Sequence, residues 1–393
     1  MRVTYVARSF LDYRIPVLEA IDREIGGGLN VVFSADYVPQ RVTRKVQGIL
    51  GERAVGMTGE KRIGPNSTQG FANGAFRLVY QPGILKAIAA TRPDVLVGDG
   101  FYQWTSFALA HRLRFATPLV VCYERTFHTE RSAQRIRLFY RKQVLRLVDA
   151  MAVNGRLARD YSEWLGMEHE RITVGQMAAD TVGLAAAVAG VSAEDKAALR
   201  VSWGSPATVF LLVSQLIERK GIVELLSAWA GVEARYGGLA ALVVVGGGPQ
   251  EAELKQQSAS QNLQHVHWAG SVDYDSIGPY YAAADAFVIP TLEDNWSLVV
   301  PEAMACGLPI LCSCYNGCHP ELVEPGGNGW VFDPLDEGDT RDTLCRALEA
   351  KDALPLMGAR SVKIVGSHTP DHAAASILQA CQIALERRGG GAA

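Results

Sequence analysis

The sequence predicts two doubly wound α/β domains, each a parallel sheet covered by helices on both faces. Short runs of β-branched and other apolar residues alternate with segments of helical period along the whole chain, as in repeated strand–helix units. The short runs are apolar throughout, which is expected for parallel strands buried on both faces. With 393 residues, of which 48% are hydrophobic, the chain is long enough for two cores of about 150–200 residues each.

The expected elements form two series. The strands of the first series are 2–7, 29–34, 94–99, 118–124, 149–154 and 171–176. The strands of the second series are 208–214, 241–248, 265–271, 285–290, 309–313 and 329–333. Because the stretch 181–206 has no strand pattern and ends in a Gly-Ser-Pro turn, we predict domains at 1–185 and 206–370. The glycine-rich stretch 47–75 lacks strong periodicity and is expected to be a functional or mobile loop, and the final RRGGGAA to be disordered.

Charge differs between the two halves. Residues 1–180 contain 25 Lys and Arg against 17 Asp and Glu, a net charge of +8, whereas the remainder has 13 against 24, a net charge of −11. The basic half suits anionic lipid headgroups or a phosphate-bearing acceptor. We do not expect nucleic acid as a partner, because no basic motif interleaved with aromatic residues is present.

Location and redox state follow from what the sequence lacks. No apolar run of about 18 residues predicts a membrane-spanning helix, and the first residues do not form a signal peptide. We therefore expect a cytoplasmic protein or one associated with the inner face of the cell membrane. Four of the seven cysteines lie between 306 and 318, in an apolar context that favours buried or partly buried free thiols over a zinc site.

The segment 283–334 is the strongest candidate for a functional site. A strand ending at Pro290 is followed by a polar loop and by a helix from about Leu298 to Cys306, which Gly307 ends. Backbone N–H groups of such a loop and of a helix N-terminus bind diphosphates or sugar hydroxyls.

Two acids, Asp294 and Glu302, lie eight positions apart in this segment. Carboxylates accept pairs of hydrogen bonds from the adjacent hydroxyls of ribose and hexoses. A plain alternative is one carboxylate at a helix N-terminus and one solvated carboxylate, which is common for either residue alone.

The whole block resembles the donor-site signature of family 4 of the retaining glycosyltransferases (group 1 glycosyltransferases). These enzymes have the GT-B fold, in which two Rossmann-like domains face a central cleft. The signature has two acids separated by seven residues, then Ala-Met-Ala-x-Gly-x-Pro and, later, Gly-x-x-Glu-Leu-Val and Asn-Gly. The resemblance implies that Glu302 holds the nucleotide ribose and that Asp294, where most members have Glu, contacts the donor sugar. It implies further nucleotide-sugar contacts for Asn295, Trp296, Ser297 and Leu298.

A second match is the sequence VSQLIERKGIVELL. Family members have Gly-Arg, four residues, and then Lys-Gly, with Arg and Lys holding the diphosphate. Lys220 and Gly221 fit this pattern, but the Arg position is Gln215, and Arg219 is the neighbouring cation that would compensate. The segment around His267 resembles the part of the family whose backbone reads the base. Asp273-Tyr274-Asp275 is similar to the metal-binding acid pair of the other, single-domain glycosyltransferase fold. Because it lies between a strand and a helix, we interpret it as a turn and helix cap and predict no catalytic metal.

The first domain matches less closely. Arg14, at the start of a helix, is a candidate for contact with the acceptor or the donor phosphate, with a surface role as the alternative. His128 corresponds to a histidine that in relatives lies against the donor sugar. The resemblance also implies that the closing helix, 371–388, packs back on this domain.

A basic segment follows His128. Its cations point either to a solvated helix face or to contact with a membrane or an acceptor pyrophosphate. The acceptor or membrane candidates in it are Arg131, Arg135, Arg141 and Lys142.

The resemblance therefore predicts a retaining, metal-independent hexosyltransferase without a cofactor. Its donor would be a UDP- or GDP-sugar and its acceptor a glycan or polyprenyl-pyrophosphate-linked glycan, in surface polysaccharide or glycolipid synthesis. Peripheral contact with an anionic membrane is part of the same hypothesis. His128, Lys220 and Asp294 are the predicted catalytic residues. The alternatives are a nucleotide-sugar-binding protein without turnover and an epimerase or phosphorylase with the GT-B fold.

Overall fold

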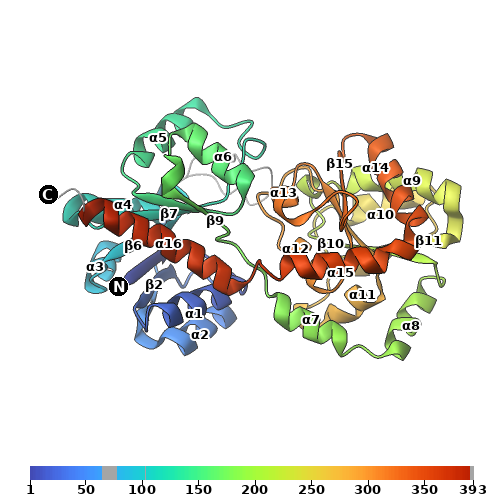
Figure 1. Cartoon of the computed structure of the whole chain (residues 1–393), viewed down its shortest axis with the longest axis horizontal. Coiled ribbons are helices and arrows are strands. Elements are labelled where there is room, and N and C mark those ends of the chain that lie inside the picture. Colours follow the sequence, from blue (N-terminus) through green and yellow to red (C-terminus); the bar gives the residue numbers. More distant parts are fainter. Residues whose placement is uncertain (64–77, 102, 390–393) are drawn as a thin grey trace. The chain divides into compact units, whose positions relative to one another are not determined.

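The computed structural model describes residues 1–63, 78–101 and 103–389 and divides them into two compact units (Figure 1). Among these residues, the first unit contains 1–178 and 368–389 and the second contains 179–367. Each unit is built on a parallel sheet, and this confirms the predicted fold class. No helix within the described ranges is both long enough and apolar enough to cross a membrane.

The first unit has a seven-stranded parallel sheet in the order β3-β2-β1-β6-β7-β8-β9. Its strands are β1 (Val3–Ala7), β2 (Leu29–Ser34), β3 (Ala54–Met57), β6 (Val95–Asp99), β7 (Leu119–Tyr123), β8 (Ala150–Val153) and β9 (Ile172–Val174). A separate antiparallel pair is formed by β4 (Lys61–Ile63) and β5 (Leu78–Tyr80). Since successive residues of a strand point to opposite faces, Tyr5 and Val6 enter two different cores, one on each side of the sheet.

Helices cover both faces of this sheet. Its helices are α1 (Arg14–Glu24), α2 (Gln40–Leu50), α3 (Ile84–Ala90), α4 (Thr105–Phe115), α5 (Arg135–Leu145), α6 (Arg156–Leu165) and α16 (Pro370–Gly389). The last helix, α16, packs along α1 and across the carboxyl-terminal strands β7 to β9. Ala373, Ile377 and Cys381 are fully buried there, because small and apolar side chains let a helix lie close to a sheet.

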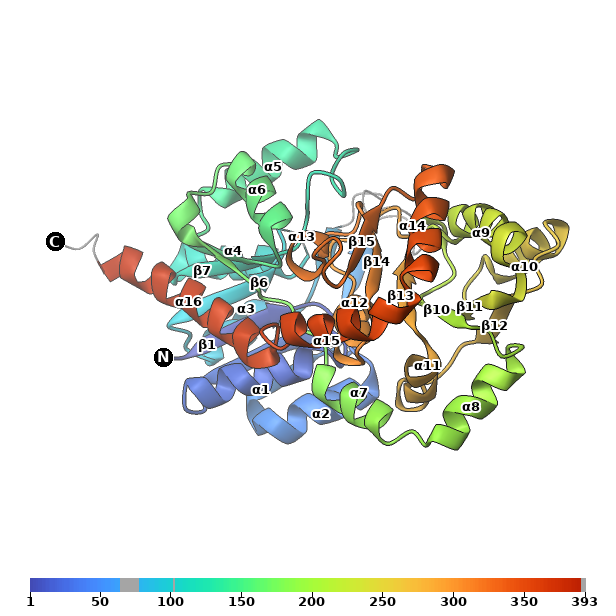
Figure 2. The same cartoon turned by 45° about the vertical axis from the view of Figure 1, so that its right-hand side comes forward.

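The second unit has a six-stranded parallel sheet in the order β12-β11-β10-β13-β14-β15, best seen in Figure 2. Its strands are β10 (Thr208–Val213), β11 (Ala240–Val245), β12 (Val266–Gly270), β13 (Ala286–Ile289), β14 (Ile310–Ser313) and β15 (Gly329–Phe332). Its helices are α7 (Thr181–Ala189), α8 (Ala193–Ser202), α9 (Ile222–Tyr236), α10 (Glu251–Ser260), α11 (Gly278–Ala283), α12 (Val299–Ala305), α13 (His319–Leu322), α14 (Glu337–Glu349) and α15 (Leu354–Val365).

The stretch 181–206, in which we placed the domain boundary, is largely helical and belongs to the second unit. Two side chains start its helices: Asp180 accepts a hydrogen bond from the backbone of Gly183, and Ser192 accepts one from Asp195. Helix α7 then packs on α11 and α12, and α8 packs on α11. These two helices account for the lack of a strand pattern in 181–206.

The glycine-rich stretch 47–75 is only partly a loop. It contains the end of α2, strand β3 and strand β4, so the part before residue 64 is regular structure. Short strands of three or four residues are too brief to show periodicity in a sequence. Residues 64–77 lie outside the described residues, as do 390–393 of the glycine-rich C-terminus.

The strand orders place a topological switch point in each unit. In the first unit, β1 lies between β2 and β6, and in the second β10 lies between β11 and β13. The chain runs outward from β1 or β10 in one direction and then returns to continue in the other. Ligands of doubly wound sheets bind outside the carboxyl ends of the strands at this point.

Candidate functional site

The loops that follow β10 and β13 meet at the second unit's switch point. The carbonyl of Arg219, after β10, accepts hydrogen bonds from the backbone N–H groups of Leu292 (2.9 Å) and Glu293 (3.2 Å), after β13. It also accepts one from the Thr291 hydroxyl at 3.0 Å. One carbonyl therefore holds the two loops together at the carboxyl edge of the sheet.

Backbone geometry explains why a glycine, Gly221, follows Lys220 in this loop. Its φ angle is +68°, in the left-handed region that favours glycine. A Cβ atom at this position would lie 2.0 Å from the carbonyl oxygen of Pro290. The close approach of the two loops thus requires the missing side chain, and it brings Lys220 beside the β13 loop.

Lys220 and Asp294 form an ion pair across these loops. Lys220 Nζ lies 2.5 Å from Asp294 Oδ2, and both side chains are nearly buried, with 12% and 13% exposed. Oδ2 also accepts from Ser297 Oγ at 2.7 Å, Oδ1 accepts from the Trp296 backbone N–H at 3.2 Å, and Arg219 Nη1 lies 3.8 Å from Oδ2. Burial raises the pKa of the Asp294 carboxyl, but Lys220, Ser297 and Arg219 outweigh it and hold the pKa below its usual value.

Asn316 supports this loop from β14 and was missed in the sequence. It is fully buried, donates from Nδ2 to Ser297 Oγ at 2.8 Å, and accepts from the backbone of Ser297 (3.4 Å) and Cys318 (3.3 Å). At Gly317, a Cβ atom would lie 2.0 Å from the carbonyl oxygen of Asn295. The turn dipeptide Asn316-Gly317 is the sequence feature that could have indicated this role. Only the thiol of the cysteine that follows it was considered.

Glu302 lies one turn into α12 and is half-buried. Burial, with a further contribution from the negative charge of Asp180, raises the pKa of its carboxyl to about 8, although the nearby Tyr281 hydroxyl lowers it. That hydroxyl is itself buried and forms no hydrogen bond of normal geometry with any described residue. Burial therefore favours the protonated form of the Glu302 carboxyl, which can both donate and accept a hydrogen bond.

The other residues predicted in the β13 loop are also close to the pair. Trp296 is 7% exposed, and its indole N–H has no hydrogen-bond partner in the part of the chain that the structure describes. Asn295 is half-buried, and Leu298 is the N-cap residue directly before α12. Gln215, after β10, is exposed.

The glycine-rich turn after β11 packs directly on the loop after β10. Cβ atoms at Gly246 and Gly248 would lie 1.8 Å from the Ser214 oxygen and 2.4 Å from the Leu216 oxygen. The Gly246 N–H also donates to the Gly270 oxygen at the end of β12, at 2.8 Å. The carboxyl ends of three neighbouring strands are thereby held in backbone contact.

Two predicted histidines belong to other elements than these loops. His267 lies within β12, where burial is the main cause of a lowered pKa and a backbone group of Trp203, at the end of α8, bonds its ring. His128 belongs to the first unit, in the turn after β7 that Thr126 and Thr129 stabilise with mutual hydrogen bonds.

Two of the predicted acceptor or membrane arginines are buried, which excludes the alternative surface role for Arg14 and a place on a solvated helix face for Arg141. Arg141 is 4% exposed and donates two hydrogen bonds to the carboxylate of Glu130. Arg14 is also 4% exposed and donates to the Gln176 carbonyl at 3.2 Å. Arg141 stands at a position of α5 that faces the core, which charge composition alone does not reveal. The remaining candidates, Arg131, Arg135 and Lys142, are exposed.

Arg14 belongs to a buried cluster at the first unit's switch point. The Tyr5 hydroxyl, on β1, donates to Asp99 Oδ1, at the end of β6, at 2.6 Å. Loss of hydration raises the pKa of Asp99, and the positive charge of Arg14 and the Tyr5 hydrogen bond offset this only in part. Sequence reasoning missed Tyr5 and Asp99 because both belong to apolar strands and look like ordinary strand residues.

A second acid in this unit, Glu60, bonds two other side chains. Glu60 accepts two hydrogen bonds from Arg8 Nε (3.0 and 2.9 Å), one from Arg8 Nη2 (2.9 Å) and one from the Trp104 indole N–H (2.8 Å). The Arg8 guanidinium also lies 3.8 Å from the centre of the Tyr37 ring. These residues follow β1, β2 and β6, so they line the same carboxyl edge as Arg14.

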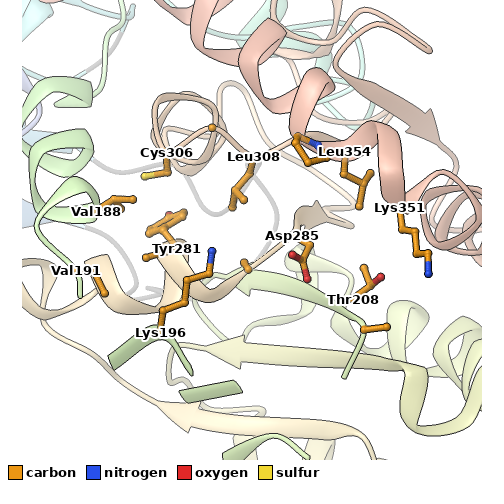
Figure 3. A pocket seen from close by; sticks show the side chains of 15 residues that line it. Val188, Val191, Lys196, Thr208, Tyr281, Asp285, Cys306, Leu308, Lys351 and Leu354 are labelled. Carbon is orange, nitrogen blue, oxygen red and sulfur yellow. The ribbon is translucent and has the colours of Figure 1, made fainter. Parts of the chain in front are cut away.

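A pocket of about 430 Å³ lies elsewhere in the second unit, at the amino ends of the strands (Figure 3). Thr208 begins β10, Asp285 precedes β13 and Leu308 precedes β14, whereas the Lys220–Asp294 pair lies beyond the carboxyl ends. None of the predicted site residues lines it. We therefore place the candidate site at the switch point and not in this pocket.

The cysteines are all free, which confirms the expectation of buried or partly buried thiols. Burial raises the pKa of the Cys306 thiol to about 12 and that of Cys314 to about 11. In the described ranges, no group of three or more His, Cys, Asp and Glu side chains is arranged to hold a metal ion.

Two protein families match the two units. The second unit matches "Glycosyl transferases group 1" over residues 195–360, and the first matches "Glycosyl transferase 4-like domain" over 33–175. Between them, these matches cover most of the chain.

Curated relatives match over part of their length. The chain is 32% identical over 168 residues to the GDP-mannose-dependent alpha-(1-6)-phosphatidylinositol monomannoside mannosyltransferase of Mycobacterium tuberculosis, covering 41% of this chain and 43% of that protein. It is 28% identical over 252 residues to the D-inositol 3-phosphate glycosyltransferase of Nocardia farcinica, covering 62% and 54%. The chain thus spans about half the length of these relatives.

Solved structures with low sequence identity share the fold over the whole chain. The Anabaena protein HepE, in complex with UDP and glucose, has a TM-score of 0.71 at 17% identity and 99% coverage of both chains. The sucrose-phosphate synthase of Thermosynechococcus elongatus has a TM-score of 0.64 at 17% identity and complete coverage of both chains. With its two parallel-sheet units and the two family matches, the chain belongs to the group 1 family of glycosyltransferases and has the GT-B fold.

Proposed function

We propose that this chain is a retaining, metal-independent glycosyltransferase that moves a hexose-type sugar from a UDP- or GDP-sugar to a glycan or lipid-linked acceptor. The observation that supports it most is the meeting of Lys220 and Asp294 at the switch point of the second unit. A cation, an acid and loop N–H groups at this place suit a diphosphate attached to a sugar.

Each residue has a task in the proposed reaction. A diphosphate would compete with Asp294 for Lys220, and Arg219, 3.8 Å from the same carboxylate oxygen, would then keep Asp294 paired. Lys220 would neutralise the charge that develops on the leaving diphosphate. Glu302 would bond the ribose hydroxyls, and the buried Trp296 indole N–H would donate to the sugar or phosphate.

Retention of configuration at the anomeric carbon determines the face from which the acceptor attacks the sugar. The acceptor hydroxyl oxygen bonds to the anomeric carbon on the face from which the donor phosphate leaves. The hydroxyl proton passes to the leaving diphosphate, so no protein nucleophile is needed. We assign His128 of the first unit to a donor-sugar hydroxyl, and Asp294 to the correct placement of Lys220 and the sugar.

The donor and acceptor classes rest on the relatives. One relative is named for GDP-mannose and another structure contains UDP and glucose, so either nucleotide is consistent with the same fold. The curated relatives act on phosphatidylinositol monomannoside and D-inositol 3-phosphate, as their names state. A phosphate-bearing or lipid-linked acceptor, and a role in surface polysaccharide or glycolipid synthesis, fit the net charge of +8 of residues 1–180.

A thermal-shift panel of UDP-, GDP-, ADP- and dTDP-sugars tests the donor assignment. One nucleotide class should raise the melting temperature, since a ligand at 100 times its Kd stabilises the folded state by about 2.7 kcal/mol. Glu302→Ala should lose this shift. Glu324→Ala, which alters an exposed carboxylate paired with Arg360 in the same unit, should keep it.

Two outcomes would change the proposal. No stabilisation by any nucleotide sugar would remove the donor site as argued. Stabilisation without sugar transfer or hydrolysis, measured with a membrane extract as the source of acceptor, would instead favour a binding protein without turnover.

A further inference from the structure

The outward side of helix α5 is both basic and apolar. Its exposed residues are Arg135, Ile136, Phe139, Lys142 and, directly after the helix, Arg146, which we call the α5 face. Ile136 is 74% and Phe139 65% exposed. The opposite side of the helix is buried against the first unit, so these large apolar side chains project away from the unit's core.

The positive charges of the α5 face are not neutralised within the unit. Helix α5 contains no acidic residue. Among the described residues, Arg135, Lys142 and Arg146 form no ion pair with a carboxylate, and Arg146 donates only to Gln143, at 3.2 Å. Arg141 of the same helix differs, because it turns inward to Glu130. Three cations therefore remain available to an external anion.

Aromatic side chains extend the α5 face toward helix α6. Lys142 Nζ lies 4.7 Å from the centre of the Trp164 ring, and that ring lies edge-on to Phe127 at 5.6 Å. Trp164 is 47% and Phe127 50% exposed. Tryptophan and phenylalanine beside lysine are the side chains that occupy the boundary between lipid headgroups and acyl chains.

We propose that the α5 face is a docking surface for an anionic lipid bilayer. Ile136 and Phe139 enter the headgroup boundary, and the three cations contact lipid phosphates on either side of them. A merely solvated basic helix would project its charges but would not expose two large apolar residues between them. The proposal concerns the first unit alone and does not depend on the donor site of the second.

Sedimentation of the full chain with vesicles tests the proposal. The wild-type chain should bind vesicles of phosphatidylcholine mixed with phosphatidylglycerol and not vesicles of phosphatidylcholine alone. The triple variant Arg135→Gln/Lys142→Gln/Arg146→Gln should bind the anionic vesicles about 100-fold more weakly, because each surface cation contributes about fivefold. The double variant Ile136→Ser/Phe139→Ser should bind at least about tenfold more weakly.

A matched double variant controls for the loss of exposed apolar residues in general. Val201 and Leu356, in the second unit, are 67% and 77% exposed, so Val201→Ser/Leu356→Ser should bind like the wild type. Circular dichroism should show that all variants remain folded. Unchanged vesicle binding by both α5 variants would overturn the proposal. So would binding by the wild type to single-stranded RNA but not to anionic vesicles, which would identify a nucleic acid as the partner.

Discussion

In the first unit, Arg14 stands at the start of the helix after β1, and Asp99 ends β6, the neighbouring strand across the switch point. In the second unit, Lys220 lies two residues before the start of the helix after β10, and Asp294 follows β13, again the strand across the switch point. The two doubly wound sheets thus place a cation and an acid at corresponding positions. They differ in how the charges are held.

Direct contact decides the charge state of the acid in each unit. Lys220 bonds Asp294 directly, and the pKa of this carboxyl is lowered in spite of burial. Arg14 instead bonds Gln176, and the pKa of Asp99 is raised because the charge of Arg14 does not fully offset the loss of hydration. The same topology therefore gives a buried cluster without a direct contact between cation and acid in one unit and a direct ion pair in the other.

The largest expected effect is on the stability of the first unit. Arg14→Met should lower the free energy of unfolding by about 3 kcal/mol, because the buried Gln176 carbonyl loses its donor and Asp99 loses its nearest positive charge. Urea denaturation followed by circular dichroism measures this. Arg44→Met, at an exposed position of α2, should change stability by less than about 0.5 kcal/mol. Equal effects of the two variants would contradict a structural role for Arg14.

The next effect is on nucleotide binding by the second unit. Lys220→Met should weaken the binding of UDP or GDP by about thirtyfold, or about 2 kcal/mol, since a charge-assisted contact with the diphosphate is lost. Isothermal titration calorimetry gives the Kd. Lys255→Met, which alters an exposed cation paired with Glu251 on α10, is the control and should bind normally. A normal Kd for Lys220→Met would place the diphosphate elsewhere.

A smaller effect, of opposite sign in the two units, is expected in the pH dependence of stability. The lowered pKa of Asp294 stabilises the fold above the unfolded-state value of about 3.9, and this stabilisation is lost as the pH falls through the folded-state pKa. The raised pKa of Asp99 favours the folded state below about pH 3.9, and that contribution is lost as the pH rises through its folded-state pKa.

The two asparagine variants separate these contributions. Relative to the wild type, Asp294→Asn should lose stability as the pH rises from 3 to 7, whereas Asp99→Asn should gain it. Chemical denaturation at a series of pH values measures both differences. Parallel curves for the two variants would show that the acids do not differ in the way that their partners suggest.

The smallest expected effect is at Gln215. Gln215→Arg should strengthen the binding of UDP or GDP by about threefold, because an exposed guanidinium adds a screened attraction for the diphosphate. Binding of the uncharged nucleosides uridine and guanosine should not change. A gain for nucleosides as well would mean that the side chain acts on the base or ribose instead.

The fold could be predicted from local sequence patterns, and the centre of the candidate site from its resemblance to a family signature. Apolar runs of four to six residues predict buried strands, and Lys220, Asp294 and Glu302 lie at fixed distances from strand ends and helix starts. Asn316 was not accessible, because its role depends on two loops that meet only in the folded sheet. Arg141 was likewise not accessible, because this charged residue is buried with Glu130, whereas the apolar Ile136 of the same helix is exposed. Which side of a short helix faces the core is decided by packing partners far away in sequence.

Helix α16 has a consequence for the order in which the units are completed during synthesis. The core of the first unit contains Ala373, Ile377 and Cys381, and Thr173 bonds the Ser376 carbonyl across 203 positions of the chain, at 2.8 Å. The unit whose strands are made first therefore cannot close its core until residues 370–389 have left the ribosome, after the whole second unit. The sheet face that α16 covers therefore stays exposed while the second unit is synthesised, and a chaperone can bind it during that time.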